Sequence, residues 1–115
     1  MLKLSDVKQM SDAELNYQLA LALGWSPNDI YREESFKDFI EVFVDDVCTT
    51  RFSFKDPTVV WRVALQFDKM PRKEVRDGKI YWSVWMPDGP GTWTIEHESP
   101  ERAVAMAVVM QVNGE

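Results

Sequence analysis

The strongest pattern of apolar and polar positions is a pair of alternating runs, Lys79–Met86 and Gly91–Glu98, rich in aromatic and β-branched residues. The turn-forming sequence Asp-Gly-Pro-Gly at 88–91 separates them, as in an antiparallel hairpin. In the first run, alternation puts Trp82 on one face and Trp85 on the other. Leaving so much aromatic surface in water would be unfavourable, so we expect helices to cover at least one face of this sheet.

Three segments carry helix start signals followed by apolar residues at helical spacing. Ser11 begins a capping box with Glu14, while Asp56 and Ser99 each precede a proline at the first helical position. The last segment is apolar nearly all round, so we expect it to be the most buried helix. The predicted helices span residues 12–23, 57–69 and 100–112.

Residues 34–47 fit two different structures. Phe36, Ile40 and Phe43 would share one side of an amphipathic helix. The run Phe39–Val44 is equally rich in strand formers, and as a strand it would pair with Thr50–Phe54. The pattern supports both interpretations.

The remaining segments carry weaker signals. We expect a single domain over residues 1–115, with residues 1–10 as a flexible N-terminal tail. Between the second helix and the hairpin, the basic residues of 69–76 are interrupted by Glu74 and Asp77, so we interpret them as a solvated connection rather than a basic patch. This connection ends at Asp77-Gly78, a turn in which the glycine can adopt positive φ.

Charge and cysteine content restrict the classes of partner. The chain has 19 acidic and 13 basic residues, a net charge of -6, which disfavours nucleic acid and anionic membranes as partners. Its single cysteine, Cys48, cannot form an intramolecular disulfide and suits a reducing compartment. No apolar stretch approaches the roughly 20 residues of a membrane span. We therefore expect a cytoplasmic protein.

The candidates for catalysis are few. His97 lies between Glu96 and Glu98, but on a strand it would point away from both, and a second imidazole is absent from the sequence. Cys48 has neither a nucleophile signature nor a neighbouring base in its sequence. We predict that the protein is not an enzyme and uses no metal or cofactor.

Three stretches resemble a known family. They are Ser11–Asn16 leading to Ala22–Trp25, Phe52–Pro57 running into a helix that contains Trp61, and Ser99–Ala103 opening the apolar last helix. Together they resemble the phage ABA sandwich domain and the NinX-like small phage proteins. The resemblance implies a central antiparallel sheet with flanking helices, encoded by a phage or prophage. It brings no established activity and no catalytic residues.

These observations lead to one fold class and two functional hypotheses. We predict an α+β fold in which an antiparallel sheet of three or more strands is covered by helices, similar to an α-β-α sandwich. The resemblance implies a phage or prophage accessory protein. Clustered carboxylates beside aromatic side chains indicate that it binds a host or phage protein, without direct contact to nucleic acid or membrane. The alternative is a small-ligand-binding domain with a cleft near Trp82 or Trp85. The predicted partner-binding residues are Tyr31, Glu33, Glu34, Asp38, Glu41, Asp45, Asp46 and Trp85.

Overall fold

The computed structural model describes residues 2–87 and 93–113. Within these ranges the chain forms four α-helices, one 3₁₀ turn and six strands, so the predicted α+β class is confirmed. In chain order the elements are α1 (Leu4–Gln9), α2 (Asp12–Ala22), η1 (Pro27–Asp29), β1 (Ile30–Tyr31), β2 (Ile40–Phe43), β3 (Thr49–Phe52), α3 (Pro57–Phe67), β4 (Arg72–Arg76), β5 (Lys79–Met86), β6 (Trp93–His97) and α4 (Pro100–Asn113).

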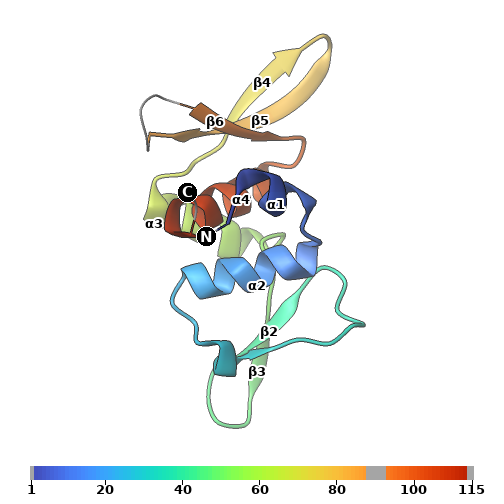
Figure 1. The fold of residues 1–115 in the computed structure, drawn as a ribbon, viewed down its shortest axis with the longest axis vertical. Coiled ribbons are helices and arrows are strands. Elements are labelled where there is room, and N and C mark those ends of the chain that lie inside the picture. Colours follow the sequence, from blue (N-terminus) through green and yellow to red (C-terminus); the bar gives the residue numbers. More distant parts are fainter. Residues whose placement is uncertain (1, 88–92, 114–115) are drawn as a thin grey trace.

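The helices lie between two antiparallel sheets (Figure 1). The first sheet has the strand order β1-β2-β3 and the second sheet the order β4-β5-β6. Helix α4 contacts β5 and β6 as well as the other three helices, while α2 contacts β2. Each sheet has three strands and is covered by helices, as predicted. The layers nevertheless run sheet, helices, sheet, because the chain makes two small sheets where the sequence showed one clear hairpin.

Helix α4 forms the centre of the protein. Every residue from Ala103 to Met110 is buried, which confirms that this is the most buried helix. Alanine at positions 103, 105 and 107 presents little side-chain bulk, so neighbouring elements can approach the helix closely, while the intervening valine and methionine side chains fill the space. A helix apolar on all sides is stable only when it is surrounded by protein on all sides.

The predicted helix starts are confirmed with one change. The Ser11 hydroxyl accepts from the backbone N–H of Glu14 at 3.1 Å, and the Asp56 carboxylate accepts from that of Thr58 at 3.0 Å. The Glu14 carboxylate does not complete a capping box. It accepts instead from the guanidinium of Arg32 at 2.8 Å, because this cation gives a stronger hydrogen bond than a backbone amide.

The ambiguous segment forms a strand. Ile40 and Val42 are buried while Glu41 and Phe43 point to the other side, so the two-residue period prevails over the helical one. β2 pairs with β3 from Ile40 opposite Phe52 to Phe43 opposite Thr49, close to the pairing proposed in the strand interpretation.

The second sheet contains the predicted hairpin and an additional strand. β5 and β6 pair antiparallel, with Val84 opposite Ile95, while the predicted loop at 88–91 lies outside the described residues. The interpretation of 69–76 as a solvated connection was wrong, because residues 72–76 form β4 and pair with β5. Charged side chains on an edge strand hinder pairing with another chain, which explains why this strand has a loop-like composition.

The turn between β4 and β5 confirms the prediction for Gly78. Asp77 and Gly78 have φ values of 52° and 76°, as a two-residue type I′ hairpin turn requires.

The expectation of an N-terminal tail was also wrong. Residues 4–9 form α1, and Val7 is fully buried against the core. The backbone N–H of Leu2 donates to the carbonyl of Asn113 at 2.9 Å, which joins the start of the chain to the end of α4. Single apolar side chains on a six-residue helix are too few to produce a periodic signal, but burial against α4 holds the segment in place.

Candidate protein-binding surface

Strand alternation places one row of side chains on the outer face of the first sheet, away from the helices. Tyr31 is opposite Glu41, and Glu41 is opposite Arg51, so these three residues form a row across the sheet. In the neighbouring row, Val42 faces inward and is buried. Tyr31 keeps 40% of its surface exposed. The outer face therefore presents an aromatic side chain, a carboxylate and a guanidinium side by side.

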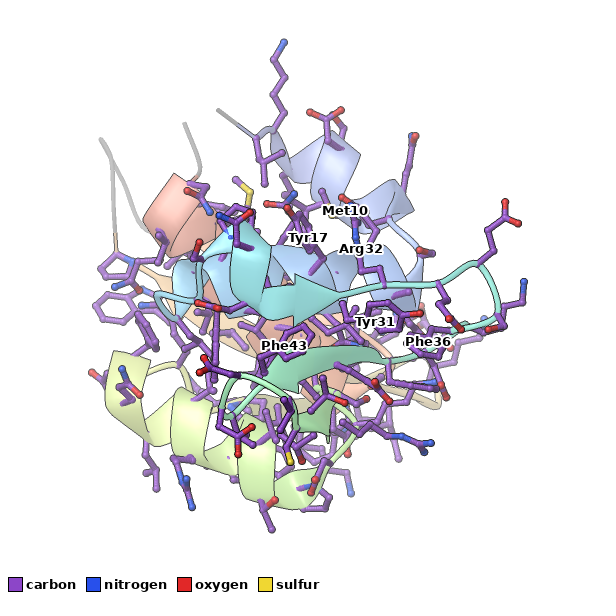
Figure 2. The ribbon with its side chains drawn as sticks, turned by 90° about the horizontal axis from the view of Figure 1, so that it is seen from below. Met10, Tyr17, Tyr31, Arg32, Phe36 and Phe43 are labelled. Atoms are coloured by element: carbon purple, nitrogen blue, oxygen red, sulfur yellow. The ribbon has the colours of Figure 1, made fainter. Side chains whose placement is uncertain are left out.

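An aromatic strip extends this row. The Tyr31 and Phe36 rings meet edge to face with centroids 5.8 Å apart, and Phe36 stacks on Phe39 at 4.4 Å. The Arg51 guanidinium lies 4.1 Å from the centroid of the Phe39 ring. Figure 2 shows Tyr31 and Phe36 adjacent, with Phe43 farther along the sheet. We define the aromatic strip as Tyr31, Phe36 and Phe39.

The strip borders a groove of about 440 Å³ between the start of α2 and residues 32–40. On its α2 side, Arg32 pairs with Glu14 at 2.8 Å and lies 3.7 Å from the centroid of the Tyr17 ring. Arg32 and Tyr17 lie close together in Figure 2. The groove is thus bounded by an ion pair on one side and by phenylalanine rings on the other.

Four of the predicted carboxylates already interact within the protein. Glu33 accepts from the Tyr31 hydroxyl, and Glu41 accepts from the Thr49 hydroxyl at 2.9 Å. Asp45 Oδ1 accepts from two backbone N–H groups, at 2.9 and 2.7 Å, and so closes the β2–β3 turn. Asp38 lies 3.7 Å from the ammonium of Lys55.

The other two carboxylates, Glu34 and Asp46, are exposed and make no hydrogen bond or ion pair with the described residues. Because their charges are not compensated by a close cation, these two are the carboxylates best placed to attract a basic partner.

Two titratable groups on this surface have pKa values shifted from their ordinary values. The hydrogen bond from Tyr31 to Glu33, together with the nearby charges of Glu33 and Glu41, raises the pKa of the Tyr31 phenol. The backbone hydrogen bonds that Asp45 accepts lower the pKa of its carboxyl group. At neutral pH the surface therefore presents a neutral phenol beside ionised carboxylates.

The structure separates Trp85 from the other predicted partner-binding residues. The rest of the set lies on β1, on β2 or in the segments that flank them, whereas Trp85 lies on β5 in the second sheet, beyond the helical layer (Figure 1). It is 53% exposed, so it could only contribute to a different surface. Arg51 was not predicted to be part of the outer face, because only strand register places it beside Glu41.

The two candidate catalytic residues are also far apart in the fold. Cys48 is exposed beside β3 in the first sheet, and His97 ends β6 in the second sheet. His97 Nδ1 accepts from the backbone N–H of Ser99 at 2.9 Å, and the Ser99 hydroxyl in turn accepts from Arg102 N–H at the start of α4. Among residues 2–87 and 93–113, no group of three or more His, Cys, Asp or Glu side chains could hold a metal ion. The absence of enzymatic activity stays a prediction.

We expect His97 to make stability depend on pH. Burial, then the charge of Arg102, lowers the pKa of His97 below its ordinary value of about 6.5. The unfolded chain therefore binds a proton more readily than the folded protein, so this contribution to stability is complete above about pH 6.5 and is lost as pH falls through the folded pKa. Protonation also removes the acceptor for Ser99 N–H.

The measurement is the melting temperature between about pH 7.5 and 5.5 for the parent protein and His97→Asn. The asparagine oxygen can still accept from Ser99 N–H but does not titrate, so the variant should lose less stability on acidification. Equal losses in the two proteins would assign the pH dependence to other groups.

In the comparisons with known proteins, no family model and no curated protein sequence matches this chain. The resemblance to small phage proteins therefore stays a prediction. In the part of the chain that the structure covers, no helix has the length and apolar character needed to cross a bilayer.

Proposed function

We propose that this protein acts by binding another protein through the outer face of its first sheet. The observation that carries this proposal is the aromatic strip, which lies partly exposed among carboxylates instead of within the core. Aromatic rings provide large contact areas with few rotatable bonds, so burying them against a partner costs little side-chain entropy. The strip is already ordered by its own ring contacts, which lowers that cost further.

Charge supports a basic partner. The segment from Asp29 to Asp46 contains seven carboxylates against two cations, Arg32 and Lys37. Such a field accelerates encounter with a cationic surface and disfavours nucleic acid, and both effects weaken as salt rises. We therefore propose a host or phage protein with a basic contact surface as the partner. The phage or prophage setting rests on the sequence resemblance.

The test begins with capture of partners on the tagged protein from bacterial lysate, followed by affinity measurements with the purified partner. Phe36→Ala removes the central ring of the strip, and Glu34→Lys reverses a carboxylate that has no partner among the described residues. Glu98→Lys is the matched control, because it makes the same charge change on an exposed residue next to the second sheet. Circular dichroism establishes that each variant is folded.

Phe36→Ala should weaken binding at any salt concentration, because it removes contact area. Glu34→Lys should weaken it on the order of tenfold at about 0.05 M salt and less at about 0.5 M, because salt screens its charge. Glu98→Lys should bind like the parent protein. A partner whose affinity is the same for all three variants would bind elsewhere on the molecule and would contradict the proposal.

A further inference from the structure

A cleft of about 390 Å³ opens on the opposite side of the first sheet, between its inner face and α3. Val42 from β2 and Val59 and Val63 from α3 provide apolar walls, and Leu23 and Trp25, which follow α2, line one end. Figure 2 shows α3 running alongside this sheet. The volume lies at the lower end of the range for small-molecule pockets.

Six polar side chains line the cleft beside these apolar walls: Thr50, Arg51, Asp56, Thr58, Arg62 and Gln66. Arg62 and Gln66 are four residues apart on α3 and therefore share one side of the helix, while Thr50 comes from β3. The side chains of Arg62, Gln66 and Thr50 make no hydrogen bond or ion pair with another residue in the described ranges, and the Arg51 guanidinium lies over the Phe39 ring. By contrast, Arg32 and Arg102 each pair with a carboxylate at 2.8 Å or less. The cleft thus combines an apolar interior with a guanidinium whose hydrogen-bonding capacity is unused.

The single carboxylate that lines the cleft is already engaged. Asp56 Oδ1 accepts from the backbone N–H of Thr58 at 3.0 Å and from the Thr58 hydroxyl at 2.8 Å. Asp56 is the N-cap residue of α3, whereas Arg62 lies more than one turn farther along the helix. A cationic ligand would have to compete with these hydrogen bonds, while an anionic ligand can reach Arg62 directly.

We propose that this cleft binds a small molecule with a flat apolar body and one anionic group of the carboxylate or sulfonate class. The body would lie between Val42 and the valines of α3, with one edge against the Trp25 indole. The anionic group would accept hydrogen bonds from the planar guanidinium of Arg62, a geometry that suits such oxygens. Gln66 and Thr50 offer further donors at the rim.

This site differs from the ligand cleft predicted beside Trp82 or Trp85, because the tryptophan that lines it is Trp25. It shares Arg51 with the protein-binding surface, whereas Arg62, the proposed contact of the anionic group, lies on α3 and outside that surface. Replacing Arg62 should therefore leave protein binding intact.

The probe is 1-anilinonaphthalene-8-sulfonate, which has a flat apolar body and one sulfonate. Its uncharged counterpart, N-phenyl-1-naphthylamine, tests the apolar contribution alone. Both are titrated into the parent protein and into Arg62→Gln, with Arg72→Gln as a control because it removes an exposed arginine from the second sheet. Amide and indole NMR shifts locate the bound probe.

The sulfonate should bind saturably and shift the resonances of Trp25, Val59 and Val63. Arg62→Gln should weaken it on the order of tenfold, whereas Arg72→Gln should leave the affinity unchanged. The uncharged probe should bind the parent protein and Arg62→Gln equally. Shifts that map elsewhere, or equal affinities of the sulfonate for the two arginine variants, would overturn the proposal.

Discussion

Replacing Asn16 by leucine is expected to lower the free energy of unfolding by about 3 kcal/mol. Asn16 is fully buried on α2, yet its amide makes two hydrogen bonds to the backbone of other segments. Nδ2 donates to the carbonyl of Asp38 at 2.9 Å, and Oδ1 accepts from the N–H of Phe54 at 2.8 Å. One side chain therefore fixes both the chain entering β2 and the chain leaving β3.

Leucine has the same branched arrangement of side-chain heavy atoms, but it would leave the N–H of Phe54 without its acceptor. The carbonyl of Asp38 would lose one of its two hydrogen bonds and keep the one from the Ser53 hydroxyl at 3.1 Å. The buried N–H of Phe54 carries most of the penalty, because an unsatisfied buried donor costs more than the hydrogen bond itself contributes. Gln18→Leu is the control, since Gln18 lies on the same helix but is half-buried and bonds only to Glu14 at 3.4 Å. It should change stability by less than about 0.5 kcal/mol.

Chemical denaturation monitored by circular dichroism gives both values. Asn16→Asp provides a second measurement. At neutral pH its buried carboxylate cannot donate to Asp38, whereas the protonated form can, so the deficit relative to the parent protein should shrink as pH falls. If Asn16→Leu and Gln18→Leu were equally stable, the two hydrogen bonds would not hold the first sheet on α2.

The helices were predictable because their signals are local. A cap at Ser11, Asp56 or Ser99 and the apolar spacing that follows act within a few residues. β4 was missed because an edge strand needs no apolar side chains where it faces water, and α1 because six residues are too short for a period. β4 joins the second sheet by pairing with β5 across the Asp77–Gly78 turn, and the charged composition of β4 does not reveal this pairing.

The candidate surface was predictable only as a cluster of charge. Local turn geometry decides which carboxylates can contact a partner. Asp45 accepts hydrogen bonds within the β2–β3 turn, whereas the Glu34 carboxylate makes no hydrogen bond or ion pair with the described residues. Strand register brings Tyr31, Glu41 and Arg51 together, and a one-residue shift would have hidden all three. Trp85 was predicted to belong to the same surface because it is aromatic, but its strand, β5, belongs to the second sheet.

A second junction, around Asp12, also joins segments that are far apart in the sequence. Asp12 Oδ1 accepts from Arg102 on α4 at 2.6 Å, and Oδ2 accepts from the ammonium of Lys55 at 3.0 Å, which raises the pKa of Lys55. Arg102 also donates to the carbonyl of Met10 at 2.6 Å. The carboxylate thus connects the α1–α2 junction to α4 and to the loop before α3.

Asp12→Ala should lower the free energy of unfolding by about 2 kcal/mol, mostly through Arg102. The Arg102 side chain is only 11% exposed, so without the carboxylate its charge stays largely desolvated and unneutralised, whereas Lys55 is 51% exposed and water can replace its partner. Double-mutant cycles should therefore give a coupling above about 1 kcal/mol for Asp12→Ala with Arg102→Met and below about 0.5 kcal/mol with Lys55→Met. The reverse order would mean that the exposed pair, rather than the buried one, holds α2 against α4.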